Sequence, residues 1–234
     1  IDYIDRVDIL QLNGDISDCQ AISRFPKVYR VSPMEELIIT RKYIIDLINY
    51  LHPKKVVINY GNHDIRFQNY MSKNLDTDLL ELMPKTSLEL IFEDGFHHYN
   101  KRERTKVWYA PLNESFENVE IVYNDNWFSQ IGEVIFCHPL TYSSQPMMTV
   151  EKARRYFKDE GYDFSTIVMA HTHRVGSYPV GNTMMYEQGA ACNVEEMKYH
   201  DGNFVRTQKE GFIYICLDKN GKEIESKTKL VRLN

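Results

Sequence analysis

Four apolar runs of this sequence, each the length of a buried β-strand, end directly in side chains that can bind a metal ion. The runs and the polar residues after them are 8–12 with Asn13-Gly14-Asp15, 56–60 with Gly61-Asn62-His63-Asp64, 133–137 with His138, and 166–170 with His171-Thr172-His173. In α/β sheets, ligands bind at the carboxyl ends of the strands. We therefore expect the four loops to converge on one metal site.

A helix is predicted between the first two runs. Ser32-Pro33 is typical of a helix start, with serine as the cap, proline in the first position and Glu35 completing a capping box. Apolar residues then recur at helical spacing until the chain reaches Pro53. A strand, a helix and a second strand form a βαβ unit, so we expect the two strands to be parallel.

The rest of the chain predicts two more helical stretches and many strands. Residues 67–92 have a helical pattern, with Leu75, Leu79, Leu82 and 88–91 as core candidates, and 149–160 form an amphipathic helix closed by Gly161. Short apolar pieces at 107–110, 119–123 and 133–137 indicate a second sheet. The later strands are expected at 174–180, 183–188, 204–207, 211–217 and 223–231, with Asn220-Gly221 as a hairpin turn between the last two.

Composition limits the class of protein. With 234 residues, 43% of them hydrophobic, we expect one domain with a sizeable core. The net charge of −5 argues against a general nucleic-acid coat, although bound metal ions could still make one pocket positive. Four cysteines without a CxxC pair predict reduced thiols in the cytoplasm. Because no apolar run is long enough to span a bilayer, we expect no membrane partner.

Taken together, the four motifs resemble the calcineurin-like metallophosphoesterase superfamily, whose pattern is DxH, GDxxD, GNH(D/E), a lone His and GHxH. The resemblance implies an α/β fold with four layers, a sandwich of two mixed β-sheets flanked by helices. It also implies roles: Asp15 would bridge two metals, Asn62, His138 and His171 would complete one site, and His173 would bind the second ion.

The resemblance assigns further roles around the substrate. His63 would stand beside the scissile phosphate as general acid or transition-state donor, and Asp64 would orient and charge-stabilise it. Asp18 falls on the second aspartate of GDxxD and is expected to support the loop. The cofactors would be two divalent ions, Mn, Fe or Zn, since a carboxylate with imidazole and amide ligands suits these metals better than Ca.

One motif of the family is missing. The first histidine is His52, so no DxH precedes Asp15, and only one metal site is complete. We expect this motif and its strand to lie upstream of Ile1, so that residues 1–234 are a single metallophosphoesterase-like domain lacking its N-terminal strand. The other possibility is a protein that binds one metal or none.

Each residue also has a simpler interpretation. His138 could be a structural histidine, Asp15 a turn residue and Asp64 a helix cap. Arg66 could contact a substrate phosphate or form a surface salt bridge, and Arg174 has the same two possibilities. The basic run 101–106 is expected to be a solvated loop, or a contact for a nucleic-acid backbone if it flanks the site.

The predicted function is hydrolysis of a phosphate ester by a metal-activated hydroxide. A phosphodiesterase or nuclease is favoured, with nucleic acid as a possible substrate, because no phosphoprotein-phosphatase signature surrounds Asn62-His63. A phosphomonoesterase or protein phosphatase is the first alternative. The second is a non-catalytic interaction module on a decayed metallophosphoesterase scaffold, which the missing DxH would support.

Overall fold

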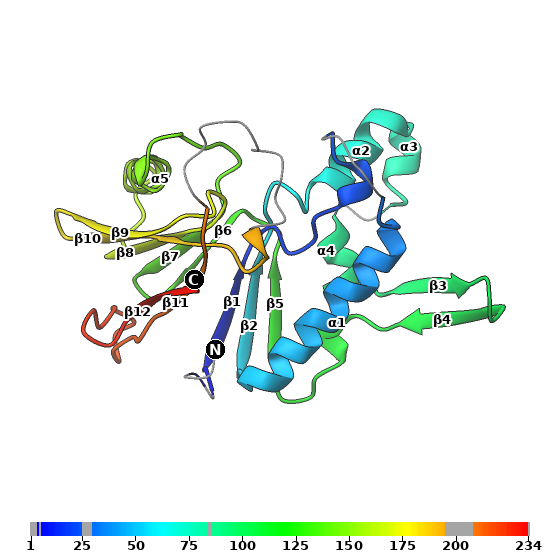
Figure 1. The fold of residues 1–234 in the computed structure, drawn as a ribbon, viewed down its shortest axis with the longest axis horizontal. Coiled ribbons are helices and arrows are strands. Elements are labelled where there is room, and N and C mark those ends of the chain that lie inside the picture. The colour runs from blue at the N-terminus through cyan, green and yellow to red at the C-terminus, as the bar shows by residue number, and fades with distance from the viewer. Residues whose placement is uncertain (1–3, 5, 25–29, 84–85, 195–207, 234) are drawn as a thin grey trace. The chain divides into compact units, whose positions relative to one another are not determined.

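The computed structural model describes residues 4, 6–24, 30–83, 86–194 and 208–233. The chain divides into two compact units, 1–125 and 126–234. Each unit contains its own β-sheet together with helices, which confirms the α/β class (Figure 1). The single domain stays a prediction.

The first unit is built on a three-stranded parallel sheet in the order β1-β2-β5. Its strands are β1 (Ile9–Asn13), β2 (Lys55–Asn59) and β5 (Glu120–Asn124). Helix α1 (Pro33–Leu51) connects β1 to β2, and these strands are parallel, so the predicted βαβ unit is confirmed. Leu37, Ile44 and Ile48 of α1 pack in one core with Val56 and Ile58 of β2.

The start of α1 differs from the prediction in its cap. Pro33 does occupy the first turn, but the side chain of Ser32 makes no capping hydrogen bond. Glu36 from the same turn accepts hydrogen bonds from the backbone N–H groups of Cys19 and Gln20 instead. The short helix η1 (Gln20–Ile22) after β1 is thereby attached to the first turn of α1.

The predicted helical stretch 67–92 is interrupted. It contains α2 (Arg66–Asn74), α3 (Thr77–Leu80), α4 (Ser87–Glu89) and a π-helical turn, η2 (Leu90–Asp94). Leu88 and Ile91 are fully buried, as predicted. The core prediction was wrong for Leu79 and Leu82, whose exposed fractions are 51% and 79%, because the breaks between the helices remove the shared face.

The three apolar pieces predicted to form one second sheet belong to three different sheets. Strand β4 (Thr105–Tyr109) pairs with β3 (Phe96–Asn100) in an antiparallel hairpin. Strand β5 joins the first sheet beside β2, after the short helix η3 (Leu112–Glu114). Only the piece at 133–137 belongs to the sheet of the second unit.

The second unit contains a mixed five-stranded sheet in the order β6-β7-β8-β10-β9. The strands are β6 (Phe128–Ile131), β7 (Val134–Cys137), β8 (Thr166–Met169), β9 (Val175–Val180) and β10 (Thr183–Gln188). Strands β7, β8 and β10 are parallel, whereas the edge strands β6 and β9 are antiparallel to their neighbours.

Both faces of this sheet are covered. Helix α5 (Met148–Asp159), which confirms the predicted amphipathic helix, packs Val150 and Phe157 against Ile167. The opposite face contacts the antiparallel pair β11 (Glu210–Tyr214) and β12 (Lys229–Leu233), through Ile213 and Leu230 among others.

The last predicted strands are partly correct. Asn220-Gly221 does lie in a tight turn. Leu217 and Glu223 form an antiparallel β-bridge across it, and the N–H of Gly221 donates to the carbonyl of Asp218. The continuous strand 223–231 was wrong, since the chain turns again at 225–227 before β12 begins. The strand predicted at 204–207 lies outside the described residues.

Across the described ranges, no helix combines the length and apolar character needed to cross a bilayer.

Candidate functional site

A ladder of three asparagines aligns the carboxyl ends of the first sheet. The strand register places Asn13, Asn59 and Asn124 side by side on β1, β2 and β5. The Asn59 Nδ2 atom donates to Asn13 Oδ1 over 3.2 Å, and Asn124 Nδ2 donates to Asn59 Oδ1 over 3.4 Å. The loops with Asp15 and with Asn62-His63 therefore leave the sheet at the same level.

The two loops approach each other closely at Gly61. A Cβ atom at Gly61 would lie 2.8 Å from the carboxyl carbon of Asp15 and would also overlap its backbone nitrogen. The N–H of His63 donates to Asp15 Oδ1 over 2.7 Å. Asp15 itself has a left-handed backbone with φ of 52°, a conformation that is costly for a non-glycine residue and common at functional sites.

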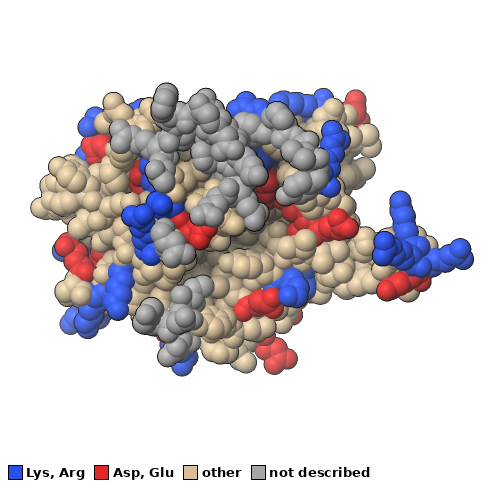
Figure 2. Space-filling model, in the orientation of Figure 1, with Lys and Arg blue, Asp and Glu red and all other residues tan. Residues whose placement is uncertain are grey.

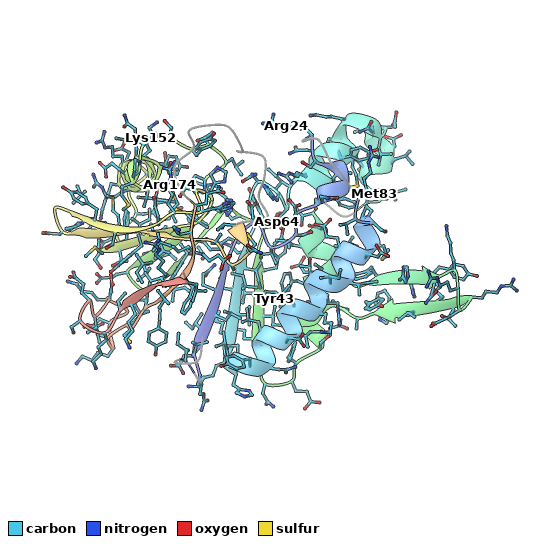
Figure 3. All side chains as sticks on the ribbon, viewed as in Figure 1. Arg24, Tyr43, Asp64, Met83, Lys152 and Arg174 are labelled. Atoms are coloured by element: carbon cyan, nitrogen blue, oxygen red, sulfur yellow. The ribbon has the colours of Figure 1, made fainter. Side chains whose placement is uncertain are left out.

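Asp64 is fully buried and joins the same two loops (Figure 3). Its Oδ2 atom accepts from the N–H of Gly61 over 2.8 Å, and its Oδ1 atom accepts from the N–H of Ser17 over 2.9 Å. The cap of α2 is Ile65, so the interpretation of Asp64 as a helix cap was wrong. These contacts make Asp64 a positioning residue for the loop that carries Asp15.

The carboxylate observed beside the His63 ring is Asp18. The Asp18 Oδ1 atom lies 2.8 Å from His63 Nδ1 and 2.9 Å from Arg66 Nη1. The hydrogen bond from His63 is the main cause that lowers the pKa of the Asp18 carboxyl. On the other side of the ring, His63 Nε2 lies 3.7 Å from Asp15 Oδ2. Arg66 therefore forms a salt bridge with Asp18, and its contact with a substrate phosphate stays a prediction.

In the second unit, the parallel strands β7 and β8 bring two histidines together. The register pairs Cys137 with Met169, so His138 and His171 both emerge at the carboxyl edge. His138 is 1% exposed, and its Nε2 atom lies 3.2 Å from His171 Nδ1. Two imidazole nitrogens bound to one metal at about 2.1 Å lie roughly 3.0–3.4 Å apart. The pair therefore fits a shared divalent cation.

The loop after β8 has an unusual backbone. His171 and His173 have φ angles of 88° and 54°, both in the left-handed region. The backbone of His173 is held by Lys209, whose N–H donates to the His173 carbonyl over 2.7 Å. The ring nitrogen Nδ1 of His173 lies 3.0 Å from Nε2 of Gln208. Sequence reasoning missed Gln208, because nothing near it in the chain marks it as a neighbour of residue 173.

The family model described as calcineurin-like phosphoesterase matches residues 1–175. The chain belongs to the calcineurin-like phosphoesterase family. A solved structure of a Vps29 single mutant from Entamoeba histolytica is 14% identical, with a TM-score of 0.36, covering 97% of this chain and 99% of that one. No curated protein matches the chain. Family membership supports a metal-dependent phosphoesterase in general and implies phosphate-ester substrates.

In this calcineurin-like phosphoesterase, two buried or half-buried ionisable side chains support the histidine loop. Arg174 donates from Nη1 to the carbonyls of Ser143 and Gln145 at 3.3 and 3.2 Å, so its guanidinium holds the segment before α5. Glu187 on β10 is buried, and burial is the main cause that raises the pKa of its carboxyl. The charge of Arg174 and a hydrogen bond with the Thr172 side chain lower that pKa, so Glu187 interacts with two residues of the loop. No motif marks Glu187 in the sequence.

Proposed function

We propose that this protein is a metal-dependent phosphoesterase whose metal ligands are Asp15, Asn62, His138, His171 and His173. Asp15 and Asn62 would come from the first unit, and His138, His171 and His173 from the second. The observation that carries the proposal is the pair of imidazole nitrogens 3.2 Å apart, with His138 buried and His171 half-buried, which suits a bound cation. The family match covers residues 1–175, the range that contains all five proposed ligands.

The donor types suit the proposed ions. Imidazole, amide and carboxylate ligands favour Mn, Fe or Zn. Such ions, when bound, would lower the pKa of a coordinated water and neutralise charge on the phosphoryl oxygens. From this sequence, Asp15 and His173 would serve the second of the two ions.

The residues of the first unit would position the acid. His63 is fixed at two points. Its backbone N–H donates to Asp15 Oδ1, and its ring nitrogen Nδ1 lies 2.8 Å from Asp18 Oδ1. In the proposed reaction its Nε2 atom would donate a proton or hydrogen bond to the leaving oxygen. Asp64 would hold the two loops in register beneath it, and Arg66 would act through Asp18.

The preferred substrate in this proposal is a phosphodiester, with a nucleic acid as one form of it. A phosphomonoester remains the competing substrate class. The test is hydrolysis of bis-p-nitrophenyl phosphate against p-nitrophenyl phosphate with added Mn. The variants are His63→Ala and Asp15→Asn, and the matched control is His52→Asn, which changes an exposed histidine at the end of α1.

We expect the parent and the His52→Asn control to hydrolyse the diester at equal rates. Loss of His63 should lower kcat by about 10²- to 10⁴-fold, the usual contribution of a general acid. Equal rates for parent and active-site variants would refute the assignment. A faster rate with the monoester would refute the diester preference alone.

A further inference from the structure

The hairpin β3–β4 is firmly anchored at its base. Phe96 is buried and stacks on Tyr109, with ring centroids 5.0 Å apart. Arg41 of α1 donates from Nε and Nη2 to the carbonyl of Ala110 at 3.1 and 2.8 Å. The hairpin therefore extends from the first unit as a fixed arm beyond α1 (Figure 1).

The tip of this arm is strongly cationic. The four residues of the turn are Lys101-Arg102-Glu103-Arg104, and Lys106 follows on β4. The turn is ordered by Asn100, whose Oδ1 accepts from the N–H groups of Arg102 and Glu103. Over the described part of the chain, none of the four cations forms an ion pair. Cationic side chains gather at the far end of the hairpin (Figure 2), in a protein with a net charge of −5.

One face of the hairpin carries aromatic rings. Alternation along the strands places His97 and Tyr99 on the same face as Lys106 and Trp108. The Trp108 indole lies against Gly95, where an added Cβ would come within 2.6 Å of the ring. The centroids of the Trp108 and His97 rings are 4.6 Å apart. Half of Trp108 and 55% of Tyr99 are nevertheless exposed. The Trp108 ring is therefore packed on Gly95 and His97, while about half of both aromatic residues stays accessible to solvent.

We propose that the β3–β4 hairpin binds single-stranded nucleic acid, with bases stacked on Tyr99 and Trp108 and the backbone phosphates on the cationic turn. Stacking platforms beside cations are the usual chemistry of sequence-tolerant single-strand binding. An anionic membrane fits less well, because the turn that would insert has only charged residues and the rings lie along the flat side.

The inference deepens the proposed phosphodiesterase function, because it names nucleic acid as the substrate class. Binding itself needs no metal and no hydrolysis. Binding can therefore be measured in EDTA, and hydrolysis separately with added Mn. Binding in EDTA without hydrolysis in Mn would count against the proposed function alone. Hydrolysis in Mn without hairpin-dependent binding in EDTA would count against the role of the hairpin alone.

The test is fluorescence anisotropy of a labelled oligothymidine of about 20 nucleotides, titrated with the whole protein in EDTA. The charge variant is Arg102→Gln with Arg104→Gln, and the stacking variant is Tyr99→Ala. The matched control, Lys42→Gln with Lys73→Gln, removes two exposed cations from α1 and α2. Circular dichroism melting verifies that each variant is folded.

We expect the parent to bind with a salt-dependent affinity. The charge variant should bind about tenfold more weakly and reduce the slope of log affinity against log salt by about 1.4. Tyr99→Ala should weaken binding about fivefold or more, while the lysine control stays within about twofold of the parent. Absent binding by the parent, an equal loss in the lysine control, or hairpin-dependent binding only to phosphatidylserine vesicles would overturn the proposal.

Discussion

The Nδ1 atom of His171 lies 3.2 Å from the Nε2 atom of His138, at the ends of two neighbouring parallel strands. Two ring nitrogens at this distance either share one proton or face one cation. The buried position of His138 and the family of the chain favour the cation.

Replacement of His171 by alanine should remove one ligand of the proposed centre. Loss of a residue that only hydrogen-bonds a metal ligand lowers metal affinity by roughly 10- to 100-fold. Because His171 would bind the ion directly, its loss should lower Mn affinity by more than this. Isothermal titration with Mn measures it, and His52→Asn is the matched control with an unchanged affinity. Unaltered binding in His171→Ala would show that this imidazole holds no ion.

Gly61→Ala should destabilise the first unit. The new methyl would overlap the backbone nitrogen and carboxylate of Asp15, both fixed by hydrogen bonds and strand register. Overpacking of this kind costs about 1–3 kcal/mol, which urea denaturation can measure. Gly176→Ala is the control, because its Cβ would meet only the flexible Met147 side chain. An equal free energy of unfolding in both variants would contradict the close approach.

Asp18→Asn should impair the proposed acid without changing substrate affinity. The variant removes the charge that accepts from His63 and Arg66, so the ring loses its fixed orientation. We expect kcat for the diester to fall about tenfold with KM nearly constant. Asp46→Asn on α1, which breaks an exposed pair with Lys42, should change neither constant. A change confined to KM would assign Asp18 to substrate binding.

Glu187→Gln should alter how stability depends on pH. Burial raises the pKa of this carboxyl, so the native state holds the proton more tightly than the unfolded chain. That stabilisation is complete below the ordinary pKa and is lost as the pH rises through the raised pKa. The glutamine variant should lack this loss and gain about 1 kcal/mol at neutral pH.

Urea denaturation from about pH 4 to about pH 8 follows both proteins through this range. The exposed Glu225→Gln is the control and should keep the pH profile of the parent. Parallel profiles for the parent and Glu187→Gln would mean that the carboxyl is equally protonated in the native and unfolded states.

The sequence predicted those parts of the fold that depend on local pattern. The βαβ unit, helix α5 and the loops after β1, β2, β7 and β8 follow from apolar runs, caps and turn residues. Strand β5 was assigned to the wrong sheet, because an apolar run does not specify its partner. Leu79 and Leu82 were placed in the core because helical spacing cannot show where a helix is interrupted.

The candidate site was predictable in its residue types and less so in its contacts. Motif order predicts Asp15, Asn62, His63, His138 and His171 as one set, and this grouping stays a prediction. It could not show that Asp18 lies beside the His63 ring or that three asparagines align the loops. The asparagine contacts depend on strand register, which no local pattern specifies. The same holds for the left-handed backbone at Asp15, His171 and His173, which is uncommon in non-glycine residues.

The central claim is that Asp15 and His138 serve the same ion, and a double-mutant cycle on Mn affinity tests it most directly. Asp15→Asn, His138→Ala and the double variant are titrated alongside the parent. We predict that both single variants weaken the same binding event, with a coupling energy above about 1 kcal/mol. Losses that simply add, or that affect two different binding events, would contradict one shared metal centre.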